Sequence, residues 1–160
     1  MIGTPADELR QDGEELLNFL VPVAFTRLEA DGEFVPFGAI VLAEGGVEPV
    51  EAAPGTAATK EPDEVFAEIL ESIRDDAESG KFRSAGLCAD VHLVNEEDDT
   101  RTDAVRVYME RRDGEAMDVF LPYEAGPDGG FVRGQIFAVE AQPKLFVTPE
   151  PGGPEAAEGQ

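Results

Sequence analysis

The chain has 160 residues, and 42% of them are hydrophobic, so it is long enough to bury the core of one compact domain. Its 35 acidic and 12 basic residues leave a formal charge of -23, a field that repels phosphate backbones and argues against nucleic-acid binding. A single cysteine permits no internal disulfide, and the first thirty residues lack the features of a signal peptide, so we expect a cytoplasmic location.

The acidity has two interpretations, and the sequence leaves both open. Only three of the cations are lysines, and a carboxylate-rich, lysine-poor surface is typical of halophilic adaptation, because high salt screens the self-repulsion. Alternatively, the acidity attracts a basic partner, as an inhibitor or immunity protein attracts a basic toxin. No uncharged apolar run approaches the roughly 20 residues of a spanning helix, so we expect no membrane protein.

The first predicted element is a kinked helix that reaches about Ala30. Residues 4–7 (TPAD) have the composition of a helix start, and leucines follow at helical spacing. Pro22 interrupts the pattern, because proline costs about 3 kcal/mol inside a helix. The alternative is therefore a strand over residues 21–28 in a hairpin that turns at Asp31-Gly32.

A hairpin and a second helix are predicted next. Residues 34–43 indicate a buried strand, and Gly45-Gly46 is a turn signal that leads to a partner strand at residues 47–51. Pro62 opens the clearest helix of the chain, which has apolar residues on one face and ends at Gly80. We expect this helix to cover a sheet.

The C-terminal half predicts antiparallel strands on either side of an acidic loop at residues 95–102. Alternating apolar residues mark both strands, namely Leu87, Ala89, Val91 and Leu93 in the first and Val105, Val107 and Met109 in the second. A three-residue turn at Gly114 then pairs Met109 with Met117, because only this register keeps apolar residues on one face.

The last predicted elements are a turn at residues 126–130 (GPDGG) and a strand at residues 131–139. Residues 147–160 are rich in proline, glycine and glutamate, so they predict a disordered tail after a single domain at residues 1–146.

The order helix, hairpin, helix and then strands resembles the roadblock and profilin-like layout. The resemblance implies an α+β fold with an antiparallel sheet of about five to six strands and two main helices, packed mostly on one face. The strings LLNFLVP, PFGAIVL, TDAVRVYMERRDGE and FLPYE also resemble those of small uncharacterised bacterial proteins, over about residues 14 to 146. Neither resemblance implies an activity, because a fold alone does not specify function.

The string CADVHLV, residues 88–94, holds the only cysteine and the only histidine of the chain. On a strand, Cys88 and His92 stand roughly 13 Å apart, too far for a thiolate-imidazole pair. With Asp90 they make too poor a ligand set for zinc. We therefore interpret Cys88 as a packed residue and His92 as a surface residue, and we expect no catalytic residue, metal or cofactor.

The other motifs point to turns and solvated loops. The acidic loop lacks the spacing and the mid-loop glycine of an EF-hand. The glycine pairs lack the Lys-Ser/Thr that follows them in a phosphate-binding loop, and no serine has the setting of a hydrolase nucleophile.

What remains is one face of the sheet, with a mixture of charged and aromatic residues. Strand parity assigns seven residues to it: Asp90, His92, Arg106, Tyr108, Glu110, Asp118 and Phe120. Arginine and aromatic residues are enriched in protein interfaces, although a third layer that covers this face would make it ordinary packing.

We therefore expect a non-enzymatic protein-binding or accessory domain, whose partner is another protein or a second copy. The alternatives are a small enzyme or ligand-binding domain that uses the Cys88, Asp90, His92 and Tyr108 face, or an acidic inhibitor of a basic toxin.

Overall fold

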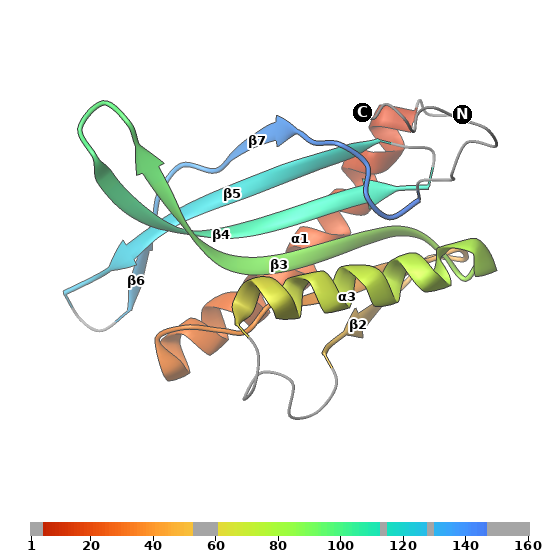
Figure 1. Ribbon diagram of the computed structural model, residues 1–160, viewed down its shortest axis with the longest axis horizontal. Coiled ribbons are helices and arrows are strands. Elements are labelled where there is room, and N and C mark those ends of the chain that lie inside the picture. The colour runs from red at the N-terminus through yellow and green to blue at the C-terminus, as the bar shows by residue number, and fades with distance from the viewer. Residues whose placement is uncertain (1–4, 53–60, 113–114, 128–129, 147–160) are drawn as a thin grey trace.

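The computed structural model describes residues 5–52, 61–112, 115–127 and 130–146, and it folds them into a curled antiparallel sheet between two helices (Figure 1). The sheet order is β2-β1-β3-β4-β5-β6, and β7 also pairs with β5. The strands are β1 (Phe37–Leu42), β2 (Val47–Val50), β3 (Phe82–Asn95), β4 (Thr100–Arg111), β5 (Ala116–Ala125), β6 (Phe131–Arg133) and β7 (Phe137–Glu140). The predicted α+β class is confirmed.

Helix α1 (Pro5–Asp31) continues through Pro22, so the helical prediction for residues 21–28 is confirmed and the strand alternative is wrong. Pro22 is exposed, while the side chains on the opposite stripe are buried against the sheet. The helix ends at Gly32, which has a φ of 81° and donates its N–H to the Leu28 carbonyl at 2.7 Å. Glycine adopts this left-handed conformation without steric cost.

Helix α3 (Pro62–Asp76) has the start and the face that the sequence predicts. The backbone N–H of Glu61 donates to the Glu64 side chain at 3.0 Å, in a capping box. Val65, Ile69 and Ile73 are buried, and a 3-10 turn, η1 (Ala77–Ser79), follows. Neither described helix is long and apolar enough to cross a membrane.

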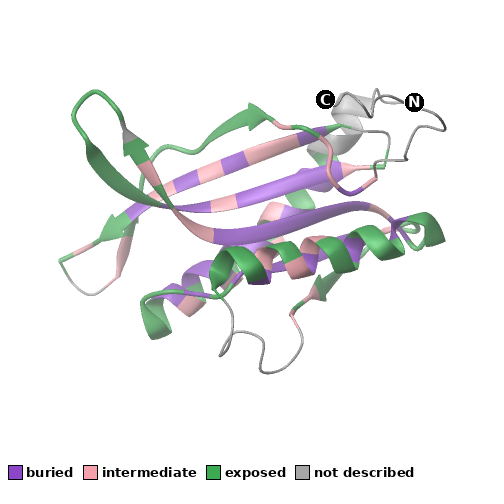
Figure 2. Cartoon of the chain, viewed as in Figure 1, coloured by how far each residue is buried: buried purple, intermediate pink, exposed green. Residues whose placement is uncertain are grey.

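The two helices lie on opposite faces of the sheet, so the expectation that they pack mostly on one face is wrong. Helix α1 packs on Phe37, Cys88 and Val107, whereas α3 packs with Leu87 and Tyr108. Successive side chains of a strand point to opposite sides, and successive residues in the middle of β3 and β4 are mostly apolar. The central strands are therefore apolar on both faces. Figure 2 shows the middle of β3 and β4 as buried.

The predicted register between β4 and β5 is confirmed. Met109 lies opposite Met117, and Val107 lies opposite Val119. The N–H of Arg111 donates to the carbonyl of Glu115 at 2.8 Å, so the pairing of the two strands extends to these residues.

Other boundaries differ from the prediction. The β3–β4 loop shrinks to residues 96–99, because both strands continue into the acidic segment. The predicted strand at residues 131–139 is divided into β6 and β7, which both pair with β5. Four predictions lie wholly or partly outside the described residues: the helix start at residues 4–7, the turns at Gly114 and at residues 126–130, and the tail at residues 147–160.

Gly38 of β1 lies against the backbone of β3, with no room for a side chain. A Cβ at this position would lie 2.6 Å from the Gly86 carbonyl oxygen, which belongs to the backbone and cannot move aside. We expect Gly38→Ala to lower the free energy of unfolding in urea by about 2 kcal/mol or more. Gly13→Ala is the matched control, because its Cβ would meet only the flexible end of Met109, at 3.0 Å. Equal stabilities of the two variants would contradict this account.

Candidate interaction surface

The β3–β4 register places the residues of the predicted interaction face on two opposite faces of the sheet. Cys88 lies opposite Val107, and Leu87 lies opposite Tyr108. Residues that lie opposite each other share a face, so Cys88, with its strand neighbours Asp90 and His92, is on the α1 side, and Tyr108 is on the α3 side. The prediction that these residues share one face is wrong. The hairpin joins the strands through a four-residue loop, 96–99, which pairs odd-numbered residues with even-numbered ones.

The three residues of the CADVHLV string have separate environments. Cys88 is fully buried in the α1-side core, and this burial raises the pKa of its thiol. Asp90 is half-buried and accepts a hydrogen bond from the Tyr123 hydroxyl at 2.6 Å. His92 is exposed, with its Nδ1 2.5 Å from Oδ1 of Asp103.

Tyr108 and Glu110 are fully buried and hold the C-terminal segment on the sheet. Glu110 accepts three consecutive backbone N–H groups, from Lys144 at 2.6 Å, Leu145 at 2.7 Å and Phe146 at 2.8 Å. Tyr108 donates its hydroxyl to Glu110 at 2.5 Å. Burial, and then the neighbouring Glu110 carboxylate, raise the pKa of Tyr108. Both side chains therefore stabilise the fold as buried residues and are not part of an exposed surface.

Arg106, Asp118 and Phe120 lie on the α3 side, where they are only partly covered. Arg106 Nε donates to Asp118 Oδ1 at 2.8 Å, and its guanidinium lies 5.2 Å from the ring centre of Phe66 on α3. Phe120 stacks on Phe137 of β7, with ring centres 5.2 Å apart. These three predicted residues are brought together, and they lie beside a surface that the sequence prediction missed.

That surface is the β6–β7 edge patch, which we define as Val132, Ile136, Phe137 and Val139. Their exposed fractions are 53%, 49%, 43% and 46%. Phe137 lies opposite Phe120 and Val139 lies opposite Asp118, so both point to the α3 side. Within the described ranges, no strand pairs with the outer side of β6 or β7.

The sequence missed this patch because residues 131–139 predict a strand without indicating its neighbours. Whether such a strand is central or at an edge depends on its pairing, which hydropathy does not indicate.

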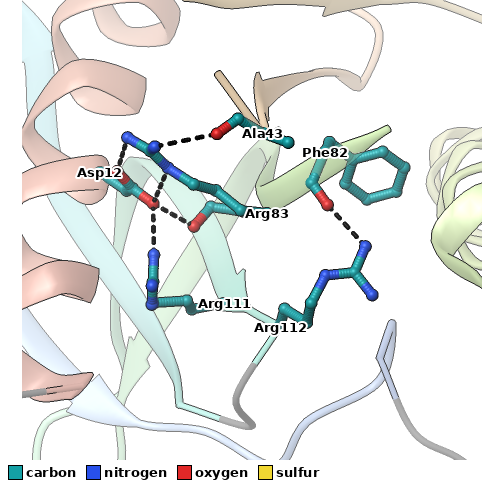
Figure 3. Close-up of polar contacts among 7 residues, drawn as sticks. Asp12, Ala43, Phe82, Arg83, Arg111 and Arg112 are labelled. Atoms are coloured by element: carbon teal, nitrogen blue, oxygen red, sulfur yellow. Dashed lines mark hydrogen bonds and ion pairs between the residues drawn. The ribbon is translucent and has the colours of Figure 1, made fainter. Parts of the chain in front are cut away.

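A polar cluster that the sequence did not indicate joins α1 to the start of β3 and the end of β4 (Figure 3). Asp12 of α1 is 2% exposed and accepts hydrogen bonds from Arg83 at 3.0 Å and Arg111 at 3.0 Å. The Ser84 hydroxyl donates to the same carboxylate at 2.5 Å. Arg112 donates to the carbonyls of Ala77 and Phe82, the first residues of η1 and β3. These five residues hold α1 and η1 on the sheet.

Two open hollows in the described part of the molecule are not lined by residues of the CADVHLV string. One of about 220 Å³ lies beside β6, and one of about 280 Å³ lies between β2 and α3; neither is lined by Cys88, Asp90, His92 or Tyr108. In the described part of the chain, no three His, Cys, Asp or Glu residues are grouped so that they could hold a metal ion.

Glu110→Gln tests the anchor of the C-terminal segment. An amide offers one acceptor where the carboxylate offers two, and it directs an N–H toward other donors, so we expect the free energy of unfolding to fall by about 3 kcal/mol. Trypsin should also cleave the variant faster after Lys144. Glu14→Gln, on the exposed side of α1, is the matched control. Wild-type stability and wild-type cleavage in Glu110→Gln would refute the anchor.

Asp90→Asn tests the cost of a half-buried carboxylate. Burial, which outweighs the hydrogen bond from Tyr123, raises the pKa of Asp90 above its ordinary value of 3.8. A group whose pKa is raised on folding contributes stability below its ordinary pKa and loses that contribution as the pH rises through the raised pKa. We therefore expect the wild type to gain stability relative to Asp90→Asn as the pH falls from 7 to 4.

The measurement is the free energy of unfolding in urea at several pH values, with exposed Asp31→Asn as the control. A difference between the wild type and Asp90→Asn that is constant from pH 7 to pH 4 would contradict the prediction.

Comparisons of the chain with protein families, with curated proteins and with solved structures find no match. The resemblance to the roadblock and profilin-like layout accordingly stays a prediction, although the α+β class agrees with it.

Proposed function

We propose that the chain is a non-enzymatic, cytoplasmic protein-binding or accessory domain that binds through the β6–β7 edge patch. The observation that carries this proposal is the exposure of four large apolar side chains, each at least 43% exposed, within eight consecutive residues at an edge of the sheet. Arg106, Asp118 and Phe120 extend this surface along the α3 side.

The character of the edge supports a binding role. Edge strands of soluble proteins are usually protected by charged residues or proline, because their unpaired backbone groups invite pairing with another chain. β7 (Phe137–Glu140) has a single charged residue, at its last position. Contiguous apolar exposure of this kind is typical of protein-binding sites.

The setting of the more reactive side chains favours binding over catalysis. Cys88 packs in the α1-side core, and Tyr108 binds Glu110 on the other side of the sheet. Asp90 binds Tyr123, and His92 binds Asp103 at the surface. An enzyme that used Cys88, Asp90, His92 and Tyr108 together would need them on one face.

The test compares two substitutions of exposed valines. Val139→Lys places a charge in the patch, and Val94→Lys is the control, since Val94 is 54% exposed near the β3–β4 hairpin. Cross-linking in the source cells and sedimentation of the purified chain then measure association with other proteins and with itself. We expect Val139→Lys to weaken association by about tenfold, a change of about 1.4 kcal/mol, and Val94→Lys to leave it unchanged.

Association that is equal in both variants would overturn the proposal. If that association also disappears as salt is raised, the acidic surface and a basic partner explain it better.

A further inference from the structure

We infer that the partner of the β6–β7 edge patch is a second copy of this chain, joined by antiparallel pairing of β7 with β7 about a two-fold axis at Ala138. This inference rests on the proposed function, because it needs the edge to be a binding surface. It adds the identity of the partner and the register of the contact.

The backbone of β7 has its free hydrogen-bonding groups in the right place. The N–H of Ala141 donates to the Ala116 carbonyl at 3.3 Å, and these two residues continue the β5–β7 register. Alternate residues of an antiparallel strand bond to the same neighbour, so Phe137 and Val139 direct their backbone groups toward β5. Ala138 therefore directs its N–H and C=O to the outer edge.

Strand parity restricts how two copies can pair. A two-fold axis perpendicular to the sheet keeps each side chain on its own face, so paired residue numbers must both be odd or both be even. An axis at Ala138 pairs this residue with itself through two reciprocal hydrogen bonds. It also places Phe137 of each copy opposite Val139 of the other, on the α3 side.

This register joins complementary side chains. Aromatic and β-branched residues that lie directly opposite each other stabilise a sheet, by roughly 0.2–1 kcal/mol for each pair. Phe137 and Val139 are half-exposed in one chain and would cover each other in the pair. Ala138 is small enough to face its own copy on the α1 side.

The segment that carries this edge does not share the acidic excess of the chain. Residues 131–146 contain Arg133 and Lys144 against Glu140, a net charge of +1, so the other residues together carry -24 of the total of -23. The segment itself therefore adds little to the repulsion between two chains. In the Ala138 register the two Glu140 side chains stand about 14 Å apart, which is more than the Debye length at physiological salt.

The experiment uses the full chain and two charged variants, Phe137→Glu and Val139→Lys. Each alone places a charge opposite an apolar residue at both contacts, so we expect each to weaken self-association by about tenfold in sedimentation equilibrium. When the two variants are mixed, Glu at 137 faces Lys at 139 at one contact, and the wild-type pair re-forms at the other. The mixture should therefore regain association. Thermal unfolding verifies that each variant is folded.

Two further measurements complete the test. Ala138→Pro removes only the outward N–H, so it should abolish self-association in a folded chain. Val94→Lys should associate like the wild type, and molar NaCl should strengthen wild-type association by screening the repulsion.

A monomeric wild type, a dimer that survives Ala138→Pro, or a mixture that does not recover would each overturn the inference. If the wild type is monomeric but captures a different protein, and Val139→Lys abolishes that capture, the proposed function stands and only the second copy is wrong. Loss of both kinds of association overturns both.

Discussion

The register between β3 and β4 is the constraint on which the rest of the structure depends. It is the longest pairing of the sheet, from Ser84 opposite Arg111 to Asn95 opposite Thr100. It decides which residues of each strand face α1 and which face α3. In the middle of β3 and β4, apolar side chains project from both faces of the sheet. Each face therefore requires a helix to cover it. The two separate cores, one beneath each helix, follow from this pairing.

Two buried carboxylates hold the periphery to this sheet. Asp12 binds two arginines and connects α1 to β3 and β4, and Glu110 gathers three successive amides of the C-terminal segment. A buried carboxylate is costly unless donors surround it, and each of these has at least three. The chain has many acidic residues, and the residue type alone does not separate Asp12 and Glu110 from the others. Their buried hydrogen-bond donors do.

Helix α3 and the C-terminal segment do not cover the β6–β7 edge patch. Helix α3 packs over β1 and β3, and the segment held by Glu110 covers Tyr108. β7 lies beyond both layers, so Phe137 and Val139 remain exposed beside the partly covered Phe120. The surface we propose for binding thus includes three of the predicted residues, together with a strand edge that only the pairing of β5 with β7 reveals.

The sequence by itself determined α3, the strands β1 to β5 and the β4–β5 register, because helical and strand periodicity and a short turn leave few alternatives. It left residues 21–28 open between helix and strand, and it predicted β6 and β7 as one strand. It also separated Cys88 from His92 by strand geometry alone. The tertiary structure decided which faces are covered. The β3–β4 register is set near the hairpin, where Arg101 and Asp103 are polar and show no hydrophobic pattern. The sequence therefore could not determine on which face of the sheet Tyr108 lies. The exposure of β7 depends on which strand lacks a neighbour, a long-range property that no local pattern encodes.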